Sequence, residues 1–174
     1  MRPVDRSRRP LLALPLLMAA LPTRSLADNA DATVLSITGP PRPAAPGRDN
    51  RVDFDLAALR KLRQQRLLTT TPWYSGASEF AGPLLREVLA AAGMDAAPES
   101  TARCTALNDY RVEIPLDDAL RYDVLVAHQL NGKPMSVRDK GPLFIIYPFS
   151  SQPQLRTTIY YNRCIWQLRT IALV

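Results

Sequence analysis

Histidine and cysteine, which often perform catalysis or bind transition metals, are scarce in this chain. Its 174 residues include a single histidine, His128, and two cysteines, Cys104 and Cys164. One histidine and no Cys-x-x-Cys pair exclude a His-rich zinc site, and Gly-x-Ser-x-Gly, phosphate-loop and dinucleotide-binding motifs are absent. We expect His128 to lie in the core or at a sheet edge, because no acidic residue or second histidine accompanies it. The common hydrolase, nucleotide-binding and zinc-enzyme classes are therefore excluded.

The N-terminus has the three regions of a cleaved export signal. Four arginines stand within the first nine residues, an apolar run of 11 residues covers 11–21, and Ser25-Leu26-Ala27 supplies small residues for cleavage. A membrane span needs about 20 residues, and Pro15 interrupts this run. We therefore predict a signal peptide over 1–27, followed by a short flexible leader over 28–32 and one domain over 28–174.

The export route stays open between two alternatives. Ser7-Arg8-Arg9-Pro10-Leu11-Leu12 is similar to a twin-arginine signal, which exports proteins that are already folded. Ala13 stands where such signals favour lysine, so the general secretory route remains the alternative. Both routes predict a periplasmic protein with no transmembrane segment in the mature chain.

Removal of the signal also removes most of the positive charge. The chain has 22 basic and 16 acidic residues, of which 1–27 holds five and one; the remainder has 17 and 15, a net charge of +2. The mature chain has no block of lysine and arginine and no basic–aromatic ladder. Nucleic-acid binding is therefore excluded as a function class.

Cys104 and Cys164 are the only cysteines, and both fall in the exported part. Two cysteines in an exported chain favour a disulfide, which would stabilise the fold by about 4 kcal/mol in the chain-entropy model. The alternative is a catalytic or metal-binding thiolate. We predict the Cys104–Cys164 disulfide.

Alternating and apolar patterns predict short strands separated by turns. We expect strands over 33–38, 67–71, 101–107, 110–114, 123–129, 143–147, 158–161 and 165–173. Asn108-Asp109 and Asn131-Gly132 are typical turn pairs. The proline-rich segment 40–50 is expected to be a loop within the domain.

Three short helices are expected among these strands. One covers 56–62 with Asp53 or Asp55 as its N-cap, one covers 83–92 and ends at Gly93, and one covers 115–120. Short strands, few short helices and no regular βαβ alternation predict a mixed, sheet-rich α+β domain.

The order and spacing of several segments resemble the molybdopterin-binding domain of the sulfite oxidase family over most of the mature chain. The segments are Phe80-x-Gly82-Pro83-Leu84, Leu107-Asn108-Asp109-Tyr110, Gly132-Lys133-Pro134-Met135, Lys140-Gly141-Pro142-Leu143 and Trp166-Gln167-Leu168. The resemblance implies the fold of that family and, as its activity, molybdopterin-dependent oxidoreduction.

Two positions depart from the pattern of that family. Counted back from Gly82, the family's molybdenum-ligating cysteine falls at about Thr70, and a threonine hydroxyl is a poor ligand for a soft metal at neutral pH. The family places an arginine that helps to hold the pterin phosphate where this chain has Phe144. Cys104 lies in a different predicted strand from the ligand segment. We therefore expect no bound metal, although the resemblance keeps molybdopterin open as a cofactor.

The resemblance implies a cleft bordered by three segments that could still bind a ligand. The candidate binding residues are Thr70, Trp73, Tyr74, Asp109, Tyr110, Arg138 and Lys140. The two cations suggest a small anionic ligand, whereas the alternative interpretation is a solvated turn with balanced charges. For Trp73 and Tyr74 the alternative is a packing role in the core or at its rim, which is the more common one for such aromatics. We expect Tyr160, Tyr161 and Trp166 to be packing residues of the last strands.

Two hypotheses on function follow. The first is an exported, non-catalytic member of the family that binds a small ligand or a periplasmic partner protein. The alternative is a genuine molybdopterin-dependent periplasmic oxidoreductase with an atypical set of metal ligands.

Overall fold

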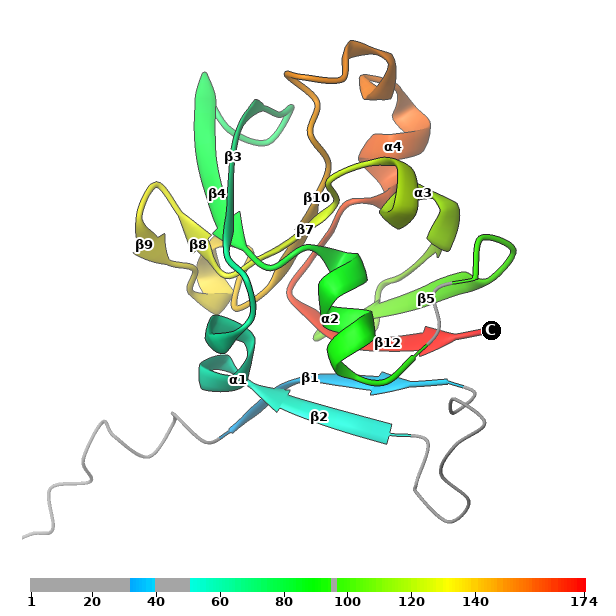
Figure 1. The fold of residues 1–174 in the computed structure, drawn as a ribbon. Coiled ribbons are helices and arrows are strands. Elements are labelled where there is room, and N and C mark those ends of the chain that lie inside the picture. Colours follow the sequence, from blue (N-terminus) through cyan, green and yellow to red (C-terminus); the bar gives the residue numbers. More distant parts are fainter. Residues whose placement is uncertain (1–31, 40–50, 95–96) are drawn as a thin grey trace, which may run out of the picture.

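The computed structural model describes residues 32–39, 51–94 and 97–174, which form three sheets with short helices between them (Figure 1). The largest sheet has five strands in the order β2-β1-β12-β5-β6. Their bounds are β1 (Thr33–Thr38), β2 (Arg51–Asp55), β5 (Thr101–Ala106), β6 (Arg111–Pro115) and β12 (Leu168–Leu173). β1 is parallel to β12, and the other pairs are antiparallel. The first and last described strands therefore lie side by side.

Two smaller antiparallel sheets carry the remaining strands. One has the order β3-β4-β8-β9, with β3 (Gln65–Thr70), β4 (Ala77–Gly82), β8 (Gln129–Leu130) and β9 (Lys133–Pro134). The other has the order β11-β10-β7, with β7 (Leu125–Ala127), β10 (Phe144–Ile146) and β11 (Ile165–Trp166). Asn131 and Gly132 join β8 to β9 with φ of 49° and 74°, as a type I′ turn requires.

Four α-helices and two 3-10 turns connect the described strands. They are α1 (Leu56–Lys61), α2 (Leu85–Ala91), α3 (Leu116–Arg121) and α4 (Thr158–Arg163), with η2 (Val137–Asp139) and η3 (Pro153–Leu155). Asp55 caps α1, because its Oδ1 accepts a hydrogen bond from the Ala58 N–H at 2.6 Å. Gly93 follows the last turn of α2 with φ of 71°, a conformation that favours glycine.

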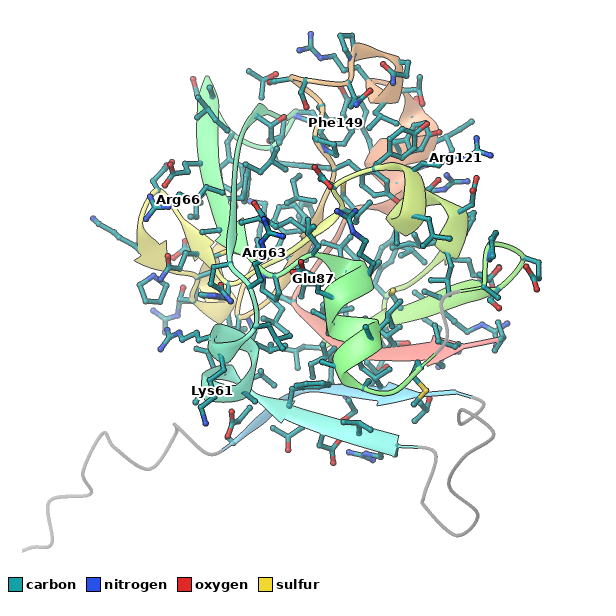
Figure 2. The ribbon with its side chains drawn as sticks, in the orientation of Figure 1. Lys61, Arg63, Arg66, Glu87, Arg121 and Phe149 are labelled. Atoms are coloured by element: carbon teal, nitrogen blue, oxygen red, sulfur yellow. The ribbon has the colours of Figure 1, made fainter. Side chains whose placement is uncertain are left out.

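The two smaller sheets meet where β4 passes close to β7. Gly82 lies against the Val126 carbonyl, and a Cβ on Gly82 would overlap that oxygen. The Val126 N–H donates to Pro83 O and the His128 N–H donates to Ala81 O, both at 2.9 Å. Only glycine permits this approach of the two backbones. Apolar side chains fill the space between the sheets and helices (Figure 2).

Most of the elements expected from the sequence are confirmed. β1 has the predicted bounds, and β3, β5, β6 and β10 lie within two residues of theirs. Of the two N-cap candidates for α1, Asp55 takes the role. Asp109 adopts φ of 63° in its predicted turn. His128 is buried, with its Nε2 2.8 Å from Oε1 of Gln64. The sheet-rich α+β fold is confirmed.

One predicted strand is wrong, and three strands, β2, β4 and β9, were not predicted. Residues 158–161 belong to helix α4 rather than to a strand. The helix turns Tyr160 towards Tyr147, with ring centroids 5.6 Å apart, and turns Tyr161 towards Phe149, at 4.8 Å. These tertiary contacts override the strand preference of isoleucine and tyrosine. β2 alternates polar and apolar residues over five positions, β4 mixes them without strict alternation, and β9 has only two residues.

The predicted Cys104–Cys164 disulfide is also wrong, because both cysteines are free thiols in the structure. Cys104 lies in the interior of the five-stranded sheet, between Ile171 of β12 and Val112 of β6. Cys164 lies directly after α4 and lines a cavity together with Asn108 and Tyr110 of the β5–β6 turn. Burial raises the pKa of the Cys104 thiol to about 12 and also raises the pKa of Cys164.

Several predictions concern residues outside the described ranges. The signal peptide 1–27, residues 28–31 of the leader and the loop 40–50 lie there, so they stay predictions. Within the described ranges, every helix is too short or too polar to cross a membrane.

A buried carboxylate joins α3, β10 and α4. Oδ2 of Asp118 accepts hydrogen bonds from the Tyr147 hydroxyl at 2.8 Å and from Nη1 of Arg163 at 2.7 Å. Burial and the adjacent Asp118 charge raise the pKa of Tyr147, which therefore stays a hydrogen-bond donor. The guanidinium of Arg163 also lies 5.1 Å from the centroid of the Tyr160 ring. Asp118 thus fixes the position of α4.

We predict that Asp118→Ala lowers the free energy of unfolding by about 3 kcal/mol, because it leaves Arg163 and Tyr147 without their buried partner. Asp117→Ala is the matched control: its carboxylate pairs with Arg121 on the exposed face of the same helix, and we expect a loss of about 0.5 kcal/mol or less. Urea denaturation measures both variants. Equal losses would contradict a structural role for Asp118.

We also predict that the native, unreduced protein reacts slowly with a thiol reagent at pH 8, because both thiols are buried and protonated. After denaturation without reductant, both cysteines should react. A denatured chain with no reactive thiol would show that a disulfide forms after all.

Candidate functional site

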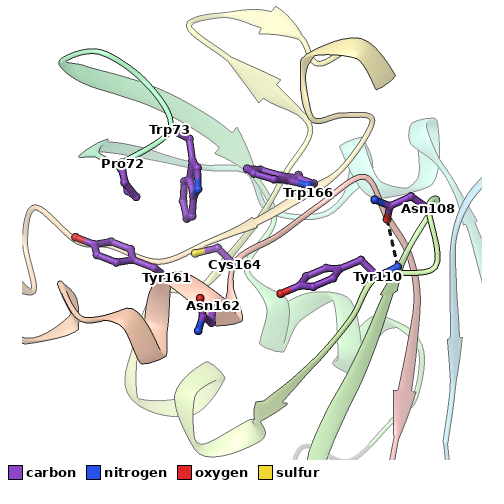
Figure 3. Close-up of a pocket in the computed structure, with 8 residues that line it drawn as sticks. All are labelled: Pro72, Trp73, Asn108, Tyr110, Tyr161, Asn162, Cys164 and Trp166. Atoms are coloured by element: carbon purple, nitrogen blue, oxygen red, sulfur yellow. Dashed lines mark hydrogen bonds between the residues drawn. The ribbon is translucent and has the colours of Figure 1, made fainter.

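A cavity of 370 Å³ opens between the β3–β4 connection, the β5–β6 turn and the end of α4. Figure 3 shows Trp73 and Trp166 on one side of it, and Tyr110, Asn162 and Tyr161 on the other. The described lining consists of four aromatic residues, two asparagines, a proline and a thiol: Trp73, Tyr110, Tyr161, Trp166, Asn108, Asn162, Pro72 and Cys164. None of these side chains is charged at neutral pH.

Trp73 is the centre of the aromatic wall. Its ring packs edge-to-face against Phe144 at 5.7 Å, Tyr161 at 6.0 Å and Trp166 at 5.7 Å between centroids. Phe144 is completely buried behind it. Because these three partners come from β10, α4 and β11, the position of Trp73 depends on three separate elements.

The segment before Trp73 is fixed by a pair of reciprocal hydrogen bonds. The Ser150 N–H donates to Oγ1 of Thr69, and the Thr70 N–H donates to Oγ of Ser150, both at 3.0 Å. Thr69 is buried, whereas Thr70 is exposed at the end of β3 and does not line the cavity. The threonines therefore tie β3 to the segment after β10.

The β5–β6 turn contributes the opposite wall. Oδ1 of Asn108 accepts a hydrogen bond from the Tyr110 N–H at 3.2 Å, and the Tyr110 side chain is 49% exposed at the cavity. Asp109, between them, points elsewhere: its Oδ1 accepts from Nη2 of Arg169 at 3.0 Å, and its side chain is 74% exposed. Asp109 therefore serves as a turn residue.

Cys164 is the only cysteine in the described lining of this cavity. It lies among the labelled side chains in Figure 3 and is 8% exposed. Burial raises the pKa of this thiol, so it is protonated at neutral pH and is a weak nucleophile in that state.

A second cavity, of 480 Å³, lies beside the β8–β9 hairpin and includes Tyr74 and Asp139 in its lining. Burial and the charge of Asp139 raise the pKa of Tyr74, and its hydroxyl is buried without a hydrogen-bond partner. Nζ of Lys140 lies 4.7 Å from the Tyr74 ring centroid and 5.2 Å from that of Trp166. Arg138 is exposed on η2 and is part of neither lining.

The structure therefore divides the residues that the sequence indicated. Trp73 and Tyr110 share one cavity, Tyr74 lines the other, and Lys140 lies over Trp166 without entering the first lining. Thr70, Asp109 and Arg138 are part of neither. Sequence reasoning missed four lining residues, namely Tyr161, Asn162, Cys164 and Trp166. Aromatic residues in an expected strand looked like packing residues, and no local pattern marked them otherwise.

The described residues hold no group of three or more His, Cys, Asp or Glu side chains arranged for a metal ion. Cys164 is the only such residue in the first cavity and Asp139 the only one in the second, within the described linings. What the first cavity offers is aromatic faces and amide groups.

Comparisons with known proteins agree with the fold. A family model described as the oxidoreductase molybdopterin binding domain matches residues 49–150. Among solved structures, the sulfane dehydrogenase SoxCD from Paracoccus pantotrophus is similar, with 15% identity and a TM-score of 0.58 over 83% of this chain and 38% of that chain. At this identity the likeness shows the fold alone, and the match spans well under half of that structure. No curated protein matches the chain.

The family match covers residues 49–150, which is more than half of the chain. It ends at Ser150, the residue that forms hydrogen bonds with Thr69 and Thr70. It includes four of the five segments whose order resembles the family, and Trp166-Gln167-Leu168 lies beyond it. The chain therefore belongs to the oxidoreductase molybdopterin-binding domain family.

Proposed function

We propose that this protein is an exported, periplasmic member of its family that binds a small ligand in the aromatic cavity and does not catalyse a redox reaction. The observation that supports the proposal most directly is the residue composition of the cavity lining. Trp73, Tyr110, Tyr161 and Trp166 surround 370 Å³ without a charged side chain, which suits the binding of a small molecule. The described lining has no imidazole, carboxylate or amine for acid–base chemistry.

The residues present do not fit a molybdenum ligand site at the position that the family uses. Thr70, the counterpart of the family's cysteine by resemblance, lies exposed outside the cavity lining, and its N–H is bonded to Ser150. A neutral hydroxyl is a poor ligand for a thiolate-seeking metal. Its neighbours Thr69 and Thr71 also offer only a neutral hydroxyl group.

The residues also do not fit the pterin phosphate. Phe144 stands where the family has its phosphate-binding arginine, and it is completely buried between Trp73 and Phe80. The described lining supplies no other cation. A phosphate in this cavity would lack the charged hydrogen-bond donors that bind such groups.

This charge pattern also argues against the small anionic ligand that the sequence suggested. Lys140 is held over the rings of Tyr74 and Trp166, and Arg138 is exposed elsewhere. A periplasmic partner protein stays compatible with the proposal, because Tyr110 at the cavity mouth is half exposed.

The alternative function is a molybdopterin-dependent oxidoreductase with an atypical ligand set, and one observation favours it. The Cys164 thiol lines the same cavity as Pro72 and Trp73, which directly follow the family's ligand segment. Burial raises the pKa of this thiol, so a bound metal would have to displace its proton. We rank this function second for that reason.

Metal analysis separates the two functions. We predict that protein exported by its own signal from a host that makes the molybdenum cofactor contains far less than one molybdenum atom per chain, and no pterin fluorescence after denaturation. The physical reason is the absence of a thiolate and of a phosphate-binding cation at the family positions.

The matched control is Cys164→Ser, which keeps the shape of the lining but removes the thiol. One molybdenum atom per wild-type chain would contradict the proposal. Loss of that molybdenum in Cys164→Ser would establish the alternative function, with Cys164 as the metal ligand.

A further inference from the structure

The aromatic walls of the cavity stand at steep angles to one another. The ring plane of Trp73 makes an angle of 76° with Trp166 and of 83° with Tyr161. Rings in this arrangement form the corner of a box. A flat heterocycle stacks best between parallel faces, whereas a compact, rounded group can meet several perpendicular faces at once.

The charge of the lining narrows the ligand class further. Each aromatic face attracts a cation within about 6 Å of its centroid, and the described lining has no cationic side chain to pair with an anion. It also has no carboxylate. A primary ammonium would lose strong hydration without full replacement of its hydrogen bonds, but a fully methylated ammonium has no N–H groups to satisfy.

Cations already lie close to two rings of this aromatic cluster, Trp166 in the cavity lining and Tyr160 outside it. Nζ of Lys140 lies 5.2 Å from the centroid of Trp166, and the guanidinium of Arg163 lies 5.1 Å from that of Tyr160. Lys140 and Arg163 are not part of the cavity lining. Rings of this aromatic cluster therefore already form cation–π contacts with side chains of the same protein.

Resting on the proposed non-catalytic function, we propose that the cavity between Trp73, Tyr110 and Trp166 binds a small organic cation that carries a trimethylammonium group. In this proposal the rings surround the methyl groups, and the amides of Asn108 and Asn162 in the lining serve the polar part of the ligand. A volume of 370 Å³ is in the range of small-molecule sites.

The composition of the chain makes this proposal easy to test. The protein has two tryptophans, and both line the cavity. The two indole N–H signals in a ¹H–¹⁵N spectrum therefore report on this site alone. The probes are choline and its uncharged isostere 3,3-dimethyl-1-butanol, at constant ionic strength set with sodium chloride.

We expect choline to shift both indole signals saturably and to bind at least about threefold more tightly than the neutral isostere, because only choline gains the cation–π term. Tyr110→Leu should weaken choline binding several-fold. Tyr110 is half exposed, so dispersed spectra should confirm that this variant folds. Leu68→Ala, at an exposed apolar residue outside the lining, is the control and should keep the affinity of the wild type.

The proposal is overturned if choline leaves the indole signals unchanged, or if the neutral isostere binds equally well. It is also overturned if Tyr110→Leu and Leu68→Ala bind choline alike. Each of these results in molybdenum-free protein leaves the proposed function standing. Failure of the proposed function is seen separately, as stoichiometric molybdenum in the same preparation.

Discussion

The packing of Trp73 is the interaction on which the rest of the site depends. Three edge-to-face contacts hold its ring against residues of β10, α4 and β11, and each such pair contributes about 1 kcal/mol beyond the burial of its surface. The ring of Trp73 thereby joins the β3–β4 connection to the last third of the chain. Without it, the cavity would lose the wall that faces Tyr110 and Asn162.

The surrounding structure fixes the positions of the three residues that contact Trp73. Asp118 fixes α4 through Arg163, so Tyr161, Asn162 and Cys164 reach the cavity together. Thr69 and Ser150 tie the end of β3 to the segment after β10. Phe144 fills the space behind Trp73 and Trp166. The threonines and the phenylalanine that depart from the family pattern therefore have structural roles of their own.

The sequence predicted the local structure wherever the controlling interaction is local. Asp55 as N-cap of α1, Gly93 after α2 and the Asn131-Gly132 turn each follow from backbone chemistry within a few residues. Helix α4 escaped prediction because its stability comes from Tyr122, Tyr147 and Asp118, which are far away in the sequence. The disulfide prediction failed for a similar reason, since spacing along the chain does not place Cys104 and Cys164 in space.

The sequence indicated half of the residues that line the cavity. Trp73 and Tyr110 were identified through the resemblance, because both lie in segments that the family shares. Tyr161 and Trp166 were assigned to packing, and they do pack against Trp73; their second role depends on a cavity that only the folded chain defines. Arg138 and Lys140 looked like anion-binding residues because their charges were visible, whereas the aromatic partners of Lys140 were not.

The central claim is that an aromatic, uncharged cavity lies beside the segment where the family resemblance leads one to expect a metal ligand. A crystal structure of protein exported from a cofactor-producing host, with anomalous data collected above the molybdenum absorption edge, tests this most directly. The account predicts no molybdenum peak, with Trp73 and Trp166 at a steep angle around solvent or an organic ligand. A molybdenum peak within bonding distance of Sγ of Cys164 would contradict it.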